Sequence, residues 1–225
     1  KKTGLVPAET ELKFLGFGTM NGKDGKPFKT REGGVMRLER LIAEITEEMY
    51  KKIDENRTVE ESEARQTAKT VGLAAIKYGD LSNQASKDYV FDVDRFTSFE
   101  GNTGPYILYT IVRIKSILNK YQAQGNDLDG LKVQDAHADC EKALMLEVAK
   151  YNDVMANAFQ DLAPHKICAY IYDLANAFNR FYHETKILAE EDQEKQKSYI
   201  ALLKVTKDVL EACIDVLGFE APERM

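Results

Sequence analysis

Four cations gather in a glycine-rich stretch near the start of the sequence, residues 16–34. Between residues 20 and 31 this stretch has a local charge of +3, although the whole chain carries −6. The cations are Lys23, Lys26, Lys29 and Arg31, and the one acid among them is Asp24. A local reversal of charge on an acidic chain is typical of a site for a polyanion. We therefore interpret the stretch as a candidate phosphate-binding loop.

The stretch fits neither of two common phosphate-binding motifs. A P-loop is excluded because Gly18 and Gly22 are one residue too close together and Lys23 is followed by an acid instead of Ser or Thr. A dinucleotide fingerprint is excluded because Asn21 stands where the third glycine belongs. A phosphate role must therefore be of another kind, and the stretch on its own equally suits a solvated hairpin loop with flexible lysines.

Aromatic side chains on two expected helices are the second set of chemical candidates. They are Tyr106, Tyr109 and Tyr121 after Pro105, and Tyr170, Tyr172, Phe178, Phe181 and Tyr182 after Pro164. We expect most of them to pack in the core. A few suit stacking on unpaired bases, because aromatic faces and arginine planes read single-stranded RNA. Arg113 lies four residues after Tyr109 on the same helical face, so this pair is a candidate to flank one base.

Other chemistries have no candidate residues. The three histidines are far apart and no CxxC or HxxxH pair exists, so we predict no protein metal site. No glycine-flanked serine offers a nucleophile, and the scattered carboxylates suit solvent-facing helical surfaces. Cys140, Cys168 and Cys213 are an odd number at wide spacings, which indicates reduced, buried thiols in a cytoplasmic protein.

The composition bounds the class of protein. With 225 residues and 44% hydrophobic content, the chain is long enough for one large or two small domains with a real core. A pI near 5.3 argues against a protein that binds nucleic acid over its whole surface. Any contact with RNA or DNA must therefore come from local patches. No apolar run reaches the roughly 20 residues of a membrane span, so we expect no membrane association.

In the N-terminal part of the chain, we expect short strands and two helices to hold the candidate residues in place. Apolar pieces at 12–17 and 27–28 suit one or two short strands joined by an exposed loop. Apolar residues from 38 to about 56 recur at three- and four-residue steps and predict an amphipathic helix. The segment Thr58–Glu61 has capping-box spacing for a second helix, and Gly79 is expected just past its end.

The C-terminal part is expected to be a helical bundle beyond a boundary in the irregular residues 80–99. In that region Tyr89–Phe91 is a candidate extended piece, and Asp92 or Asp94 is a candidate cap for one helical turn. The first bundle helix should begin at Pro105, capped by Thr103 or Asn102, and stop at Gly125. Further stripes predict helices at 139–151, 153–162, 164–184 and 198–217, the last ended by Gly218, with a solvated loop at 190–195.

Five separated motifs, in one order, resemble the arginyl-tRNA synthetase family. Together they span almost the whole chain, which makes coincidence far less plausible than for any one of them. They are Gly22–Arg31, Ala75–Ser82, Phe99–Tyr106 with Tyr109 and Arg113, Tyr172–Tyr182, and Ala221–Met225.

The resemblance implies a mainly α chain with two parts. Residues 1–99 would be the end of a class I Rossmann-type catalytic domain, with short strands plus helices, and 100–225 an all-α anticodon-binding domain named for its Asp-Ala-Leu-Arg motif. The family's His-Ile-Gly-His motif is absent from this chain, and Lys26–Arg31 stands where other class I enzymes have Lys-Met-Ser-Lys-Ser. On this resemblance Lys29 and Arg31, supported by Lys26, contact the phosphates of ATP, and magnesium arrives with the nucleotide.

The same resemblance assigns the partners. It places Tyr109, Arg113, Tyr182 and Met225 around a flipped anticodon base of tRNA(Arg). It implies a cytoplasmic arginine–tRNA ligase, monomeric at full length, that uses arginine and ATP and binds neither DNA nor membranes. This chain would supply the phosphate loop and anticodon recognition and would be inactive alone. The alternative is a non-catalytic helical interaction module of the same architecture, and the coding sequence upstream of Lys1 would distinguish the two.

Overall fold

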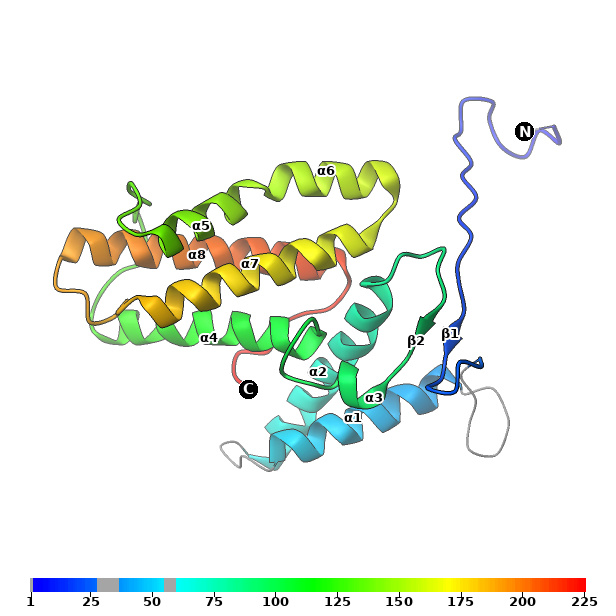
Figure 1. Ribbon diagram of the computed structural model, residues 1–225, viewed down its shortest axis with the longest axis horizontal. Helices are drawn as coiled ribbons and strands as arrows, with labels where there is room; N and C mark the ends of the chain where they lie inside the picture. Colours follow the sequence, from blue (N-terminus) through cyan, green and yellow to red (C-terminus); the bar gives the residue numbers. More distant parts are fainter. Residues whose placement is uncertain (1, 28–36, 55–59) are drawn as a thin grey trace.

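The computed structural model describes residues 2–27, 37–54 and 60–225 and is mainly helical, as predicted (Figure 1). Its N-terminal part pairs two long helices beside a two-residue parallel ladder, and its C-terminal part is a five-helix bundle. The elements are β1 (Met20–Asn21), α1 (Leu38–Asp54), α2 (Glu61–Leu81), β2 (Tyr89–Val90), α3 (Val93–Phe96), α4 (Gly104–Ala123), α5 (Asp139–Ala149), α6 (Tyr151–Asp161), α7 (Pro164–Glu184) and α8 (Gln193–Val216).

Helix α4 is the element that joins the two parts. Its predicted apolar face is confirmed, since the residues that form it are at most 4% exposed: Ile107, Ile111, Ile114, Leu118 and Tyr121. The predicted cap is also confirmed, because Thr103 Oγ1 accepts a hydrogen bond from the Tyr106 N–H at 3.2 Å. At Gly104 an added Cβ would lie 2.4 Å from the Ala74 carbonyl oxygen, so the start of α4 packs directly on the backbone of α2.

Gly79 does not end its helix, contrary to the prediction. Helix α2 continues to Leu81, and a Cβ on Gly79 would lie 2.9 Å from the Phe96 ring. The glycine is therefore explained by close packing of α3 on α2 and not by a left-handed cap. The predicted cap Thr58 lies outside the described residues, and the structure begins α2 at Glu61, after Glu60 as the N-cap residue.

The predicted strands at 12–17 and the loop at 190–195 are also corrected. Residues 12–17 form no strand, and the short strand β1 lies after them, paired in parallel with β2 through Met20 and Tyr89. Helix α8 begins at Gln193, because the Asp192 carboxylate accepts hydrogen bonds from the N–H groups of Glu194 and Lys195 and caps it. At the other end Gly218, with φ +80°, terminates α8 as predicted.

All three cysteines lie in the part of the chain that the structure describes. Cys140, Cys168 and Cys213 are free and buried, as predicted, and burial raises the pKa of the Cys168 and Cys213 thiols to about 12. Across residues 2–27, 37–54 and 60–225, no helix is both long enough and apolar enough to cross a bilayer.

Asp92 links the phosphate-loop region to α3, which leads to a testable stability effect. Its carboxylate caps α3 through the Asp94 N–H at 3.1 Å and pairs with Lys23 Nζ at 3.0 Å. We expect Asp92→Ala to lower the free energy of unfolding in urea by about 1 kcal/mol, the usual effect of losing a cap. Asp94→Ala, which removes an 85% exposed partner of Lys23 but keeps the cap, should change it by less than about 0.5 kcal/mol. Equal losses in both variants would contradict the capping role.

Candidate functional site

Tyr109, Arg113 and Tyr182 meet on one face of the bundle, where α4 lies beside α7. The guanidinium carbon of Arg113 lies 4.7 Å from the centre of the Tyr109 ring and 5.1 Å from the centre of the Tyr182 ring. Both distances are within the range of a cation–π interaction. Helical spacing placed Tyr109 and Arg113 on one face and the family resemblance grouped Tyr182 with them, and the structure brings these three side chains together.

Polar side chains behind the cluster fix the arginine. Arg113 Nη1 donates to Asn179 Oδ1 at 2.5 Å, and Asn179 Nδ2 donates to the Tyr106 hydroxyl at 2.9 Å. The Tyr106 hydroxyl in turn donates to Asn176 Oδ1 at 2.7 Å, and burial raises the pKa of Tyr106. Sequence reasoning missed both asparagines as functional candidates. Asn179 carried a signal, because it precedes Tyr182 by three residues and so shares its face of α7.

The cluster has the chemistry to bind an unpaired, negatively charged chain. Tyr109 and Tyr182 keep 40% and 38% of their surfaces exposed, so their rings remain available for stacking. The other aromatics of the two helices divide as predicted, since most of them are buried in the core: Tyr121, Tyr170, Phe178 and Phe181. Exposed rings around a fixed guanidinium combine base stacking with attraction for phosphate, which is how proteins bind single-stranded nucleic acid.

Met225 lies in a separate, neighbouring concavity of about 490 Å³. Its lining consists of Val112, Ser116, Asn119, Lys120, Ala123, Glu223, Arg224 and Met225. Positions 109, 113, 116, 120 and 123 share one stripe of α4, because helical neighbours recur every three or four residues. The structure therefore places Met225 beside the same helix as the tyrosine–arginine cluster, in a concavity that none of the three cluster residues lines.

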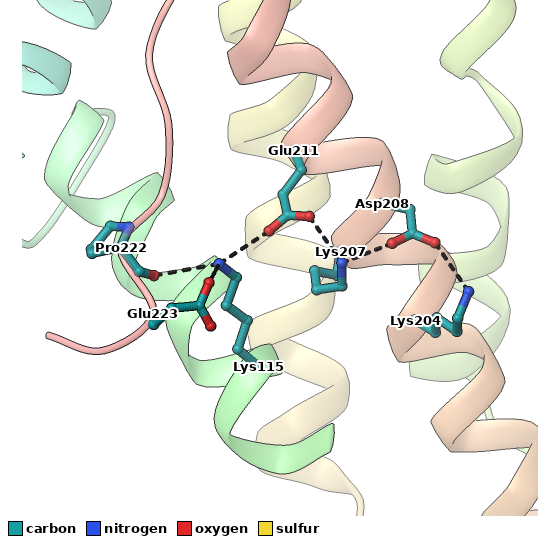
Figure 2. A network of polar contacts seen from close by, with 7 residues as sticks. All are labelled: Lys115, Lys204, Lys207, Asp208, Glu211, Pro222 and Glu223. Atoms are coloured by element: carbon teal, nitrogen blue, oxygen red, sulfur yellow. Dashed lines mark hydrogen bonds and ion pairs between the residues drawn. The ribbon is translucent and has the colours of Figure 1, made fainter. Parts of the chain in front are cut away.

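Charged side chains fix the polypeptide leading to Met225. Lys115 Nζ lies 2.8 Å from Glu223 Oε1 and 3.3 Å from Glu211 Oε1, and it donates to the Pro222 carbonyl at 3.5 Å (Figure 2). The next residue, Arg224, forms a bidentate ion pair with Glu63 of α2. The hydrogen bond to Arg224 holds the pKa of Glu63 below its ordinary value.

Only part of the candidate phosphate loop is described. Lys26 is exposed, and its N–H donates to Asp24 Oδ1 at 3.1 Å in the turn at the end of the described range 2–27. Lys23 pairs with Asp92 and Asp94, and hydrogen bonding to Asp92 and Asp94 raises its pKa. Lys29 and Arg31 lie outside the described residues. Within the part that is described, no group of three or more His, Cys, Asp or Glu residues has the arrangement to hold a metal ion.

Two family models match this chain. The first covers the part with the candidate phosphate loop, and the second covers the part with the tyrosine–arginine cluster. Residues 1–93 match the family tRNA synthetases class I (R), catalytic domain, and residues 107–225 match the DALR anticodon binding domain. The fold and the match define a class I aminoacyl-tRNA synthetase portion that carries an anticodon-binding bundle. Among curated relatives, an Agathobacter rectalis arginine–tRNA ligase is 66% identical over 100% of this chain, and an Alkaliphilus oremlandii arginine–tRNA ligase is 57% identical over the same share. The chain belongs to the arginyl-tRNA synthetase family.

Solved structures agree on the fold. Thermus thermophilus arginyl-tRNA synthetase aligns with 94% of this chain at a TM-score of 0.81 and 24% identity, a likeness of fold alone. Plasmodium falciparum arginyl-tRNA synthetase aligns with 84% at a TM-score of 0.72 and 28% identity. The chain spans 39% and 38% of the two curated relatives, and 35% and 34% of these two solved chains.

Proposed function

We propose that this chain is the portion of an arginine–tRNA ligase that contributes the phosphate loop and recognises the anticodon. Its substrates would be arginine, ATP and tRNA(Arg), in a cytoplasmic enzyme that is monomeric at full length. High identity to proteins named arginine–tRNA ligase supports this function and disfavours a non-catalytic interaction module. The proposed boundary between a catalytic part, 1–99, and an anticodon-binding part, 100–225, is close to the division between the two family matches.

The cationic stretch would act on ATP. Activation of arginine displaces pyrophosphate, so the transition state accumulates negative charge on phosphate oxygens. Cations placed where that charge develops lower the barrier, and glycines permit the movement that brings them there. We assign this role to Lys29 and Arg31 with support from Lys26, whose exposed side chain is compatible with it. Lys23 is less suited to it, because Asp92 and Asp94 already neutralise it. Magnesium would arrive with the nucleotide.

The helical bundle would bind the anticodon loop of tRNA(Arg). The observation that carries this assignment is the position of the Arg113 guanidinium between the exposed rings of Tyr109 and Tyr182. When an anticodon base leaves its own stack and stacks on such a ring, the contact contributes roughly 1–3 kcal/mol to the free energy of binding. Met225, in the adjoining concavity, would contact the same loop. No DNA and no membrane surface is part of this proposal.

Aminoacylation of tRNA(Arg) tests the proposed function. The full-length protein should attach arginine to tRNA(Arg) in an ATP-dependent reaction and should not attach lysine or glutamine. The 225-residue chain, which lacks the His-Ile-Gly-His motif, should bind tRNA in a salt-sensitive way and attach nothing. A full-length protein inactive with arginine, or a fragment that charges tRNA unaided, would contradict the assignment.

A further inference from the structure

The C-terminal strap, which we define as residues 219–225, lies against α2 and α4 after leaving the end of α8 (Figure 1). Its start is fixed by a Schellman motif, in which the Phe219 N–H donates to the Ile214 carbonyl at 3.1 Å and the Gly218 N–H to the Asp215 carbonyl at 2.8 Å. The Phe219 side chain is buried, and Lys77 of α2 donates to the Gly218 carbonyl. The strap therefore leaves the bundle in a defined direction.

Lys115 fixes the middle of the strap. Its side chain is only 12% exposed, and its ammonium group contacts Glu211 of α8 and both Pro222 and Glu223 of the strap. Glu211 also belongs to a series of ion pairs along α8, in which Lys207 Nζ lies 2.9 Å from the Glu211 carboxylate and 2.8 Å from the Asp208 carboxylate (Figure 2). A poorly solvated ammonium group with two carboxylate partners holds its contacts more firmly than an exposed ion pair does.

Glu63 fixes the end of the strap from the other part of the molecule. The Arg224 guanidinium contacts both oxygens of the Glu63 carboxylate through two nitrogens, a geometry that restrains orientation as well as distance. Glu63 belongs to α2, within the match to the catalytic family, whereas Arg224 belongs to the anticodon-binding match. Met225 directly follows Arg224 in the sequence and lies in the wall of the α4 concavity.

We propose that Glu63 and Lys115 are positioning residues for RNA recognition, which set the place of Met225 on the α4 face through the strap. The inference rests on the proposed anticodon-binding role of that face. It adds that an acid outside the anticodon-binding domain contributes to recognition without contacting RNA. The consequence is that removing a negative charge at position 63 weakens RNA binding.

The direction of that effect separates positioning from general electrostatics. Glu63→Gln removes a negative charge, which through charge alone would strengthen the binding of a polyanion. The proposal expects the opposite, a two- to fivefold weaker affinity of the full-length protein for an arginine anticodon stem-loop at fixed salt. Lys115→Met should weaken it by about tenfold, since it releases two strap contacts. Exchanging the charges in Glu63→Arg with Arg224→Glu should restore the affinity to within twofold.

Glu61→Gln is the matched control. Glu61 is an acid on the same helix, and its carboxylate pairs with Arg65 at 3.0 Å. This variant should bind the stem-loop as tightly as the unaltered protein or more tightly. In a Met225→Ala background, Glu63→Gln should change the affinity less than twofold, because both substitutions act through the same residue.

A second measurement reports on the strap without RNA. The methyl NMR signal of Met225, assigned through Met225→Leu, should narrow and move toward the position of a solvated methionine in Glu63→Gln but not in Glu61→Gln. Unchanged or tighter stem-loop binding by Glu63→Gln, with this signal displaced, would overturn the proposal and leave anticodon binding intact. Failure of the unaltered protein to bind the stem-loop would instead overturn the proposed function and, with it, the positioning role.

Discussion

Replacing Arg113 by alanine is expected to weaken binding of an arginine anticodon stem-loop to the full-length protein by at least about fivefold. The substitution removes a fixed cation, its two tyrosine contacts and its hydrogen bond to Asn179. Loss of a stacking and charge platform of this kind costs about 1–3 kcal/mol, or roughly 5- to 150-fold in affinity. Equilibrium titration of a labelled stem-loop at constant salt measures the effect.

Two further variants separate the platform from simple charge. Arg113→Lys keeps the charge but loses the planar group that fits both rings and the amide, so it should recover only part of the affinity. Arg180→Ala removes an equal charge from α7, where Arg180 is exposed and paired with Glu184 at 2.9 Å. It should weaken binding no more than about threefold, as expected for a single exposed charge that is not part of the cluster. Equal losses for Arg113→Ala and Arg180→Ala would mean that the platform has no specific role.

Replacing Gly104 by alanine is expected to have the largest effect on stability. The added Cβ would meet the Ala74 carbonyl oxygen at 2.4 Å and the Ala75 nitrogen at 3.0 Å, and both belong to the backbone of α2. Backbone inside a helix cannot move aside as a flexible side chain does, so α2 and α4 must separate. We expect the free energy of unfolding to fall by about 3 kcal/mol, at the upper end of typical overpacking effects. Urea denaturation followed by circular dichroism measures this loss.

The control for Gly104→Ala is a glycine with free space around it. Gly16 has the Phe14 ring as its nearest neighbour, at an ordinary contact distance of 3.8 Å. Gly16→Ala should therefore change the free energy of unfolding by less than about 0.5 kcal/mol. A Gly104→Ala protein as stable as the unaltered one would show that α2 and α4 do not pack at this distance.

Local signals in the sequence were sufficient for most of the helices. Helix α7 begins at Pro164 and ends at Glu184, the predicted bounds, because proline at the start and a regular apolar stripe are both local. Thr103 and Gly218 also perform the capping roles predicted for them. Each of these features depends on residues within one or two turns of one another.

Features that depend on distant contacts were not predictable in the same way. Gly79 resembled a helix end, but its reason is the Phe96 ring, which another element brings against it. The pairing of Met20 with Tyr89 joins residues far apart in a ladder too short to leave a periodic pattern. The run at 190–195 looked like a solvated loop because its charges conceal the cap at Asp192.

The candidate site was predictable in its residue types but not in its assembly. Four-residue spacing places Tyr109 and Arg113 on one face, and the family resemblance groups Tyr182 with them, but Asn179 is recognised only through the packing of α7 on α4. The strap contact between Arg224 and Glu63 joins residues 161 positions apart, and isolated charges form no sequence pattern that predicts such a pair. The roles of Tyr109, Arg113, Tyr182 and Met225 in binding an anticodon base stay predictions. So do the phosphate-binding roles of Lys26, Lys29 and Arg31, of which the last two lie outside the described residues.

The affinity ratio between two stem-loops tests the central claim, that the α4–α7 face reads an anticodon base. The full-length protein is titrated at one salt concentration with an arginine anticodon stem-loop and with the same stem-loop carrying a different central base. We predict at least a tenfold preference for the arginine anticodon, falling to less than threefold in Arg113→Ala, because phosphate contacts do not distinguish bases. Equal affinity of the unaltered protein for both stem-loops would contradict the account.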